Sequence, residues 1–131
     1  MPAVKIEVRK EYTQDQEIAI IDAVYKAIKE AFKLLPYDKD IRFVSYEPHR
    51  FAAPTNLEKP ELFTLVSVEA FSGRSIEAKR ELYTKIVDNL EALEIPKNHV
   101  KIILHEIPKE NWGIRGGQAG CDVELGFDIN V

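Results

Sequence analysis

The sequence is poor in cysteine, since Cys121 is the only one among 131 residues. A single cysteine excludes a disulfide within the chain and leaves no cysteine pair to begin a zinc site. The histidines, His49, His99 and His105, show no metal-ligand spacing either. We therefore assign no metal and no cofactor, and we interpret Cys121 as a buried, inert thiol.

Long hydrophobic runs and an excess of one charge are also absent. No stretch approaches the ~20 apolar residues that cross a bilayer, and the start of the chain lacks the layout of a signal peptide. The 18 basic and 22 acidic residues are interspersed, giving a net charge of -4 and no basic patch for a phosphate backbone. We expect a cytoplasmic protein that binds neither membrane nor nucleic acid.

The first half of the chain shows the pattern of a β-α-β unit. Residues 3–9 alternate apolar and polar side chains, as a strand with one buried face does. A capping box at Thr13 begins a helix whose apolar residues recur at helical spacing as far as Leu35. Pro36 ends this expected helix, and residues 41–46 are rich in the β-branched and aromatic side chains of strands.

The second half repeats the same order. Residues 48–60 contain three prolines and form a connection. After it, residues 63–70 and 100–104 are strand-like, and Ser75 caps an intervening amphipathic helix. We therefore expect an internal duplication, in which Pro36 corresponds to Pro96.

These units predict one α+β domain over residues 1–131, with repeats at about 2–48 and 62–107 and an extension at 108–131. Right-handed crossovers place both helices on one face of a four-stranded sheet, which makes a two-layer α/β architecture. The other sheet face is left bare, so we expect self-association through it. In the extension, the alternation over residues 121–131 predicts an additional strand or hairpin, docked on a neighbouring subunit or on its own sheet.

Pro2 and Arg74 are the residues most suited to chemistry. Removal of Met1 turns Pro2 into a secondary amine with a reference pKa of about 8, which an apolar pocket lowers toward neutrality, so Pro2 can act as a general base. Arg74 lies between a strand end and a helix start, where its planar guanidinium can hold a substrate carboxylate. Ser75 caps the helix and exposes its backbone N–H end to the same carboxylate.

Three further residues are candidates from their positions. Asp38 follows the first helix and by itself is a turn aspartate. Trp112 is a pocket wall or a core aromatic. Arg115 stands among glycines that fit neither a Walker loop nor a dinucleotide fingerprint, so we assign no nucleotide.

Together, Pro2, the duplicated β-α-β order and two motifs resemble the tautomerase superfamily. The motifs are Gly73-Arg74-Ser75 followed by Glu77 and Lys79, and residues 111–117 with the sequence NWGIRGG. The similarity is greatest to the branch that contains malonate semialdehyde decarboxylase, because Ala31, Phe32, Pro36 and Asp38 match that branch's pattern around its catalytic aspartate.

This resemblance implies a homotrimer that acts on small oxo acids with catalytic Pro2, Asp38 and Arg74. Related decarboxylases carry a second arginine in the loop, where this chain has Phe71 and Ser72, and Arg115 and Arg50 are the candidate substitutes. We place keto-enol tautomerisation of substrates such as phenylpyruvate first. A decarboxylase or hydratase with protonated Pro2 and Asp38 is the alternative, and a non-catalytic trimeric binding protein is the third interpretation.

Overall fold

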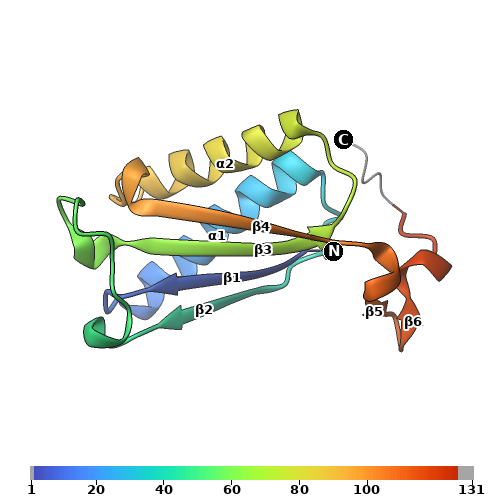
Figure 1. Cartoon of the computed structure of the whole chain (residues 1–131), viewed down its shortest axis with the longest axis horizontal. Coiled ribbons are helices and arrows are strands. Elements are labelled where there is room, and N and C mark those ends of the chain that lie inside the picture. Colours follow the sequence, from blue (N-terminus) through green and yellow to red (C-terminus); the bar gives the residue numbers. More distant parts are fainter. Residues whose placement is uncertain (1, 127–131) are drawn as a thin grey trace.

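The computed structural model describes residues 2–126 and shows a four-stranded sheet, two long helices and a small hairpin (Figure 1). The main elements are β1 (Ala3–Val8), α1 (Gln14–Phe32), β2 (Ile41–Ser45), β3 (Thr64–Phe71), α2 (Ile76–Glu91) and β4 (Val100–Ile107). The hairpin consists of β5 (Gly113–Ile114) and β6 (Gln118–Ala119). The β-α-β order expected from the sequence occurs twice, which confirms the predicted fold class. Within residues 2–126, no helix has both the length and the apolar character needed to cross a bilayer.

The strand order of the main sheet is β2-β1-β3-β4. Each repeat contributes a parallel pair, and the two repeats join through the antiparallel pair of β1 and β3. Because of this pairing, the amino end of β1 lies beside the carboxyl end of β3, with Ala3 opposite Glu69. The start of the chain, the end of β3 and the hairpin therefore lie at the same end of the molecule (Figure 1).

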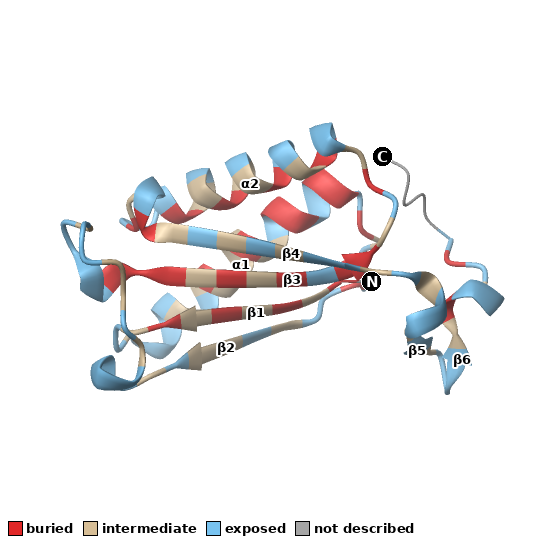
Figure 2. Ribbon diagram, in the orientation of Figure 1, coloured by how far each residue is buried: buried red, intermediate tan, exposed pale blue. Residues whose placement is uncertain are grey.

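The core lies between the sheet and the two helices, which cover the same sheet face. Buried residues alternate along β1 and β3 and face the inner sides of both helices (Figure 2). The core side chains from these four elements include Val4, Ile6, Ile20, Val24, Ile28, Val66, Val68, Leu82, Ile86 and Leu90. Removal of this apolar surface from water is the main force that holds the helices on the sheet.

Local hydrogen bonds fix where each helix begins. The Gln16 N–H donates to Thr13 Oγ1 at 3.2 Å, and the Thr13 N–H donates to Gln16 Oε1 at 2.9 Å, which completes the predicted capping box. The first helix ends at Phe32, before the expected Leu35, because Lys33 adopts a left-handed φ of 53° and its N–H bonds to the Lys29 carbonyl.

The sheet face opposite the helices carries mixed side chains. One row across the four strands contains Arg42, Lys5, Ser67 and Ile103, and the next contains Val44, Glu7, Leu65 and Lys101. The expectation of a largely apolar bare face is therefore met only in part. Contact between copies through this face would have to pair charges as well as bury hydrophobic groups.

The end of the chain differs from the sequence prediction. Residues 121–126 form no strand, since Gly120–Asp122 is a short 3-10 helix, and residues 127–131 lie outside the described residues. The hairpin instead turns at Gly116 and Gly117, whose φ angles of 84° and 92° suit glycine. The prediction of a buried Cys121 was wrong, because this cysteine is exposed.

Candidate active site

Pro2, Asp38 and Arg74 lie at one edge of the sheet. Pro2 directly precedes β1, Asp38 lies shortly before the parallel strand β2, and Arg74 follows the antiparallel strand β3. The strand directions therefore bring two amino-end residues together with one carboxyl-end residue. All three are buried, with exposed fractions of 7% for Asp38 and 5% for Arg74.

Pro2 and Asp38 line the same small cavity. Its volume is about 10 Å³. Its other walls include the apolar side chains of Ile28, near the end of α1, and Leu34, shortly after this helix. The Asp38 backbone N–H donates to the Leu35 carbonyl at 3.0 Å, which fixes the turn that carries the aspartate. A cavity of this size is close to the smallest that holds one water molecule.

Arg74 has one hydrogen-bonding edge without partners among the described residues. Its Nη1 donates to the Phe71 carbonyl at 3.3 Å, and its Cζ lies 4.1 Å from the centroid of the Phe32 ring. The Nε and Nη2 atoms are buried and have no hydrogen-bond partner among residues 2–126. These two donors share one edge of the guanidinium, which is the arrangement that binds a carboxylate through two parallel hydrogen bonds.

The charge on Arg74 is shaped by its surroundings. Burial lowers the pKa of Arg74 to about 10, while the negative charges of Glu106 and Asp38 act in the opposite direction. Arg74 therefore stays a cation at neutral pH. Buried donors without partners cost free energy, and an anion bound to Nε and Nη2 would remove this cost by accepting their hydrogen bonds.

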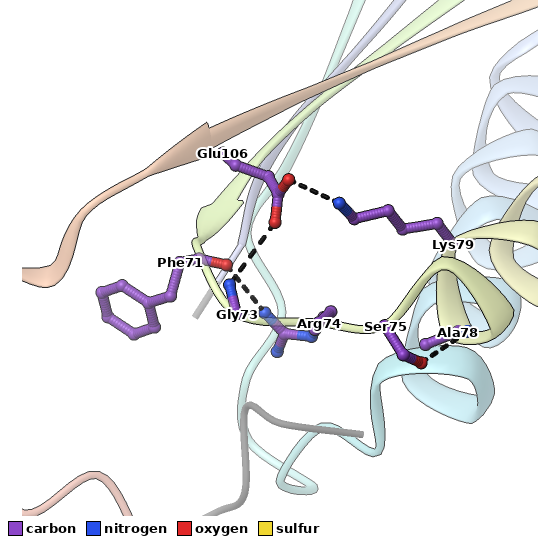
Figure 3. A network of polar contacts seen from close by, with 7 residues as sticks. All are labelled: Phe71, Gly73, Arg74, Ser75, Ala78, Lys79 and Glu106. Atoms are coloured by element: carbon purple, nitrogen blue, oxygen red, sulfur yellow. Dashed lines mark hydrogen bonds and ion pairs between the residues drawn. The ribbon is translucent and has the colours of Figure 1, made fainter.

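The turn that carries Arg74 is held at both ends (Figure 3). The Gly73 N–H donates to Glu106 Oε2 at 3.4 Å, and the other Glu106 oxygen pairs with Lys79 on α2. On the other side, Ser75 Oγ accepts the Ala78 N–H at 3.1 Å and caps α2, as predicted. Glu106, near the end of β4, was not among the candidate residues predicted from the sequence.

Trp112 and Arg115 lie in the segment that follows β4. The Trp112 indole donates to the Ile107 carbonyl at 3.1 Å, and its ring packs against Phe71 with centroids 5.0 Å apart. Trp112 is therefore next to the residue whose carbonyl receives Arg74. The Arg115 guanidinium instead donates to the carbonyls of Glu124 and Leu125, at 2.6 and 3.3 Å. Within a single copy of the chain, these bonds attach Arg115 to the segment that contains Glu124 and Leu125.

Comparison with known proteins identifies the family of this chain. Residues 38–115, more than half of the chain, match the family described as "Tautomerase enzyme". The chain belongs to this tautomerase family. It is 44% identical over 48 residues to 2-hydroxymuconate tautomerase of Comamonas testosteroni, a match that covers 36% of this chain and 76% of that protein. A probable tautomerase of Ralstonia nicotianae is 34% identical over 53 residues, covering 40% of this chain and 76% of the relative.

Solved structures share the fold of this tautomerase-family protein. An FG41 malonate semialdehyde decarboxylase inhibited by 3-bromopropiolate has a TM-score of 0.78 at 22% identity, over 88% of this chain and 91% of that one. A native fused 4-OT has a TM-score of 0.82 at 16% identity, over 95% and 99% of the two chains. Family membership and the curated relatives make this protein an enzyme of the tautomerase type.

Proposed function

We propose that this enzyme is a cofactor-independent tautomerase that interconverts the keto and enol forms of small 2-oxo acids such as phenylpyruvate. The observation that carries the proposal is the Nε and Nη2 edge of Arg74, which has no partner among residues 2–126 and is buried at the end of the sheet that also holds Pro2 and Asp38. A buried guanidinium edge of this kind fits the carboxylate that every 2-oxo acid carries.

Pro2 is the proposed acid/base group, and Met1 must first be removed to free its amine. In the ketone-to-enol direction, the neutral amine takes a proton from the carbon next to the carbonyl and returns a proton to the oxygen. The reverse direction uses the same two transfers in the opposite order. The apolar part of the cavity wall, with Val4, Ile28 and Leu34, favours the neutral amine that this chemistry needs, whereas Asp38 in the same wall acts in the opposite direction.

We also propose that a homotrimer completes the site. A cavity of about 10 Å³ beside Pro2 is far below the roughly 300 Å³ of small-molecule pockets, so one chain alone offers no room for phenylpyruvate. Contact between copies adds new walls at the sheet edge and covers the bare sheet face. Fused 4-OT, which shares this fold, has been solved as a trimer.

Decarboxylation is the second candidate, and the position of Asp38 favours it. A negative carboxylate in the same cavity as Pro2 stabilises the protonated amine. A protonated Pro2 polarises the carbonyl of a 3-oxo acid. Carbon dioxide can then leave, because the electron pair of the broken carbon–carbon bond forms the C=C bond of the enol and the carbonyl oxygen takes a proton from the amine. The fold shared with malonate semialdehyde decarboxylase is compatible with this chemistry.

Two assays separate these candidates. The purified enzyme is tested for ketonisation of phenylpyruvate enol and for carbon dioxide release from malonate semialdehyde. We expect ketonisation, and we expect Arg74→Ala to lower kcat/KM about 100-fold through the loss of two charged hydrogen bonds. The matched control is Arg80→Ala, which removes an exposed arginine of α2 and should leave kcat/KM unchanged. Carbon dioxide release without ketonisation would show that the enzyme is a decarboxylase and not a tautomerase.

A further inference from the structure

We propose that Glu106 is a positioning residue for Arg74, and that Lys79 keeps the Glu106 carboxylate off the guanidinium. Glu106 fixes the turn that carries Arg74, while Lys79 keeps Glu106 from occupying the edge of Arg74 that would bind the substrate carboxylate. This inference rests on the proposed function, because it takes Arg74 to be the group that holds the substrate carboxylate.

The two oxygens of Glu106 have separate partners. Oε1 pairs with the Lys79 ammonium on α2, and Oε2 accepts the Gly73 N–H at 3.4 Å (Figure 3). Both side chains of the ion pair are partly exposed, with exposed fractions of 21% for Lys79 and 31% for Glu106. Glu106 therefore links the end of β4 to the first turn of α2 and to the turn between β3 and α2.

The contact with Gly73 matters because this turn has few other anchors. The last bond that continues the pairing with β4 is from the Ser72 N–H to the Ile107 carbonyl, at 3.2 Å. Gly73 then adopts a φ of 127°, a conformation that side chains rarely allow. Arg74 lies between this glycine and the Ser75 cap, so the loss of the Glu106 contact frees the backbone that orients Arg74.

The role proposed for Lys79 follows from the opposite charges of Glu106 and Arg74. Glu106 acts on the charge of Arg74 more strongly than Asp38 does, so its carboxylate is within electrostatic reach of the guanidinium. Nevertheless, the described contacts of Glu106 go to Lys79 and Gly73, and the Nε and Nη2 atoms of Arg74 have no partner among residues 2–126. Carboxylates bind arginine readily through two parallel hydrogen bonds. Removal of Lys79 should let Glu106 occupy the edge that substrate needs.

The test is a set of variants assayed with phenylpyruvate enol, with KM and kcat measured separately. Glu106→Ala should raise KM about tenfold, since small misplacements of a binding group are costly, whereas Glu106→Gln keeps an acceptor for Gly73 and should stay near the wild type. Lys79→Met should also raise KM. Adding Glu106→Gln to Lys79→Met should restore KM, because the competing charge is gone.

The control is Glu30→Ala, which breaks another ion pair of α2, the 3.0 Å contact between Glu30 and Lys85. This variant should keep the KM of the wild type. A KM unchanged in folded Glu106→Ala, or a double variant no better than Lys79→Met, overturns the proposal. If Glu106→Ala does not fold, the comparison of Lys79→Met with the double variant decides.

A second measurement separates this inference from the proposed function. The affinity for 3-phenylpropionate, a carboxylate that cannot tautomerise, is measured by calorimetry for the same variants. If the wild type shows no turnover, the proposed function is refuted. Weaker binding of 3-phenylpropionate by Glu106→Ala and Lys79→Met than by the wild type would still support the positioning role. A wild type that fails to bind 3-phenylpropionate, or variants that bind it equally well, overturns the inference.

Discussion

The Cζ atom of Arg74 lies 4.1 Å from the centroid of the Phe32 ring. Phe32 is the last residue of α1 in the first repeat, and Arg74 lies just before α2 in the second. The ring face attracts the cation without using any of its hydrogen-bond donors. The two repeats therefore meet at this pair, and the Nε and Nη2 donors of Arg74 have no partner among residues 2–126.

The first prediction concerns the pH dependence of substrate binding. Burial lowers the pKa of Arg74 to about 10, so the group is fully charged at neutral pH and loses its charge as the pH rises through this value. We expect KM for phenylpyruvate to rise above about pH 10. Steady-state assays from pH 7 to pH 11 measure this change.

Arg74→Lys is the matched variant for that profile. Lysine is also a cation, but its ordinary pKa is about 10.4, so the same burial moves its loss of charge to lower pH. The rise in KM should therefore begin at lower pH in this variant. Identical profiles for both enzymes would mean that the residue at this position does not hold the carboxylate.

The second prediction concerns the cap of α2. Ser75 Oγ accepts the Ala78 N–H at 3.1 Å, so Ser75→Ala leaves that donor without its partner. We expect a loss of about 1 kcal/mol in the free energy of unfolding, measured by urea denaturation. Ser75→Asp keeps an acceptor at this position and should retain most of the stability. Equal losses in both variants would show that capping is not the cause.

The third prediction compares two glycines in the segment that follows β4. A Cβ at Gly120 would lie 2.7 Å from the Lys109 carbonyl oxygen and 3.4 Å from both the Phe71 ring and Trp112 Cβ, whereas a Cβ at Gly113 would meet nothing within 4 Å. Gly120→Ala should therefore displace the backbone around residue 120 from Phe71, whereas Gly113→Ala should leave this packing unchanged. Trp112 is the only tryptophan in the sequence, so its fluorescence reports this packing directly. A spectrum unchanged in Gly120→Ala would contradict the packing described here.

The repeated β-α-β order could be predicted from the sequence because both repeats bury one continuous face. The alternation of Val4 and Ile6 and the capping box at Thr13 are local signals that tertiary packing did not override. The end of α1 was misplaced because the left-handed conformation of Lys33, a residue without a glycine's freedom, has no sequence signal.

The tail and the site show where local patterns fail. The alternation after Cys121 suggested a strand, but Leu125 from that stretch packs with Phe71 as part of a small separate cluster instead. Arg74 was predicted from its place between strand and helix. Phe32, whose ring lies near its guanidinium, and Glu106, which contacts its turn, come from distant elements. The antiparallel pairing of β1 and β3 and the parallel pairing of β3 and β4 help to bring them there.

The most direct test of the central claim blocks the amine of Pro2 without changing its side chain. An alanine inserted between Met1 and Pro2 places a residue before the proline, so its nitrogen becomes an unreactive amide. Intact mass establishes which residue begins each purified protein, and ketonisation of phenylpyruvate enol is then compared. We predict that the protein beginning at Pro2 is active and that the extended protein is about 100- to 10,000-fold slower, the usual contribution of a general acid/base. Equal rates for the two proteins would contradict catalysis by Pro2.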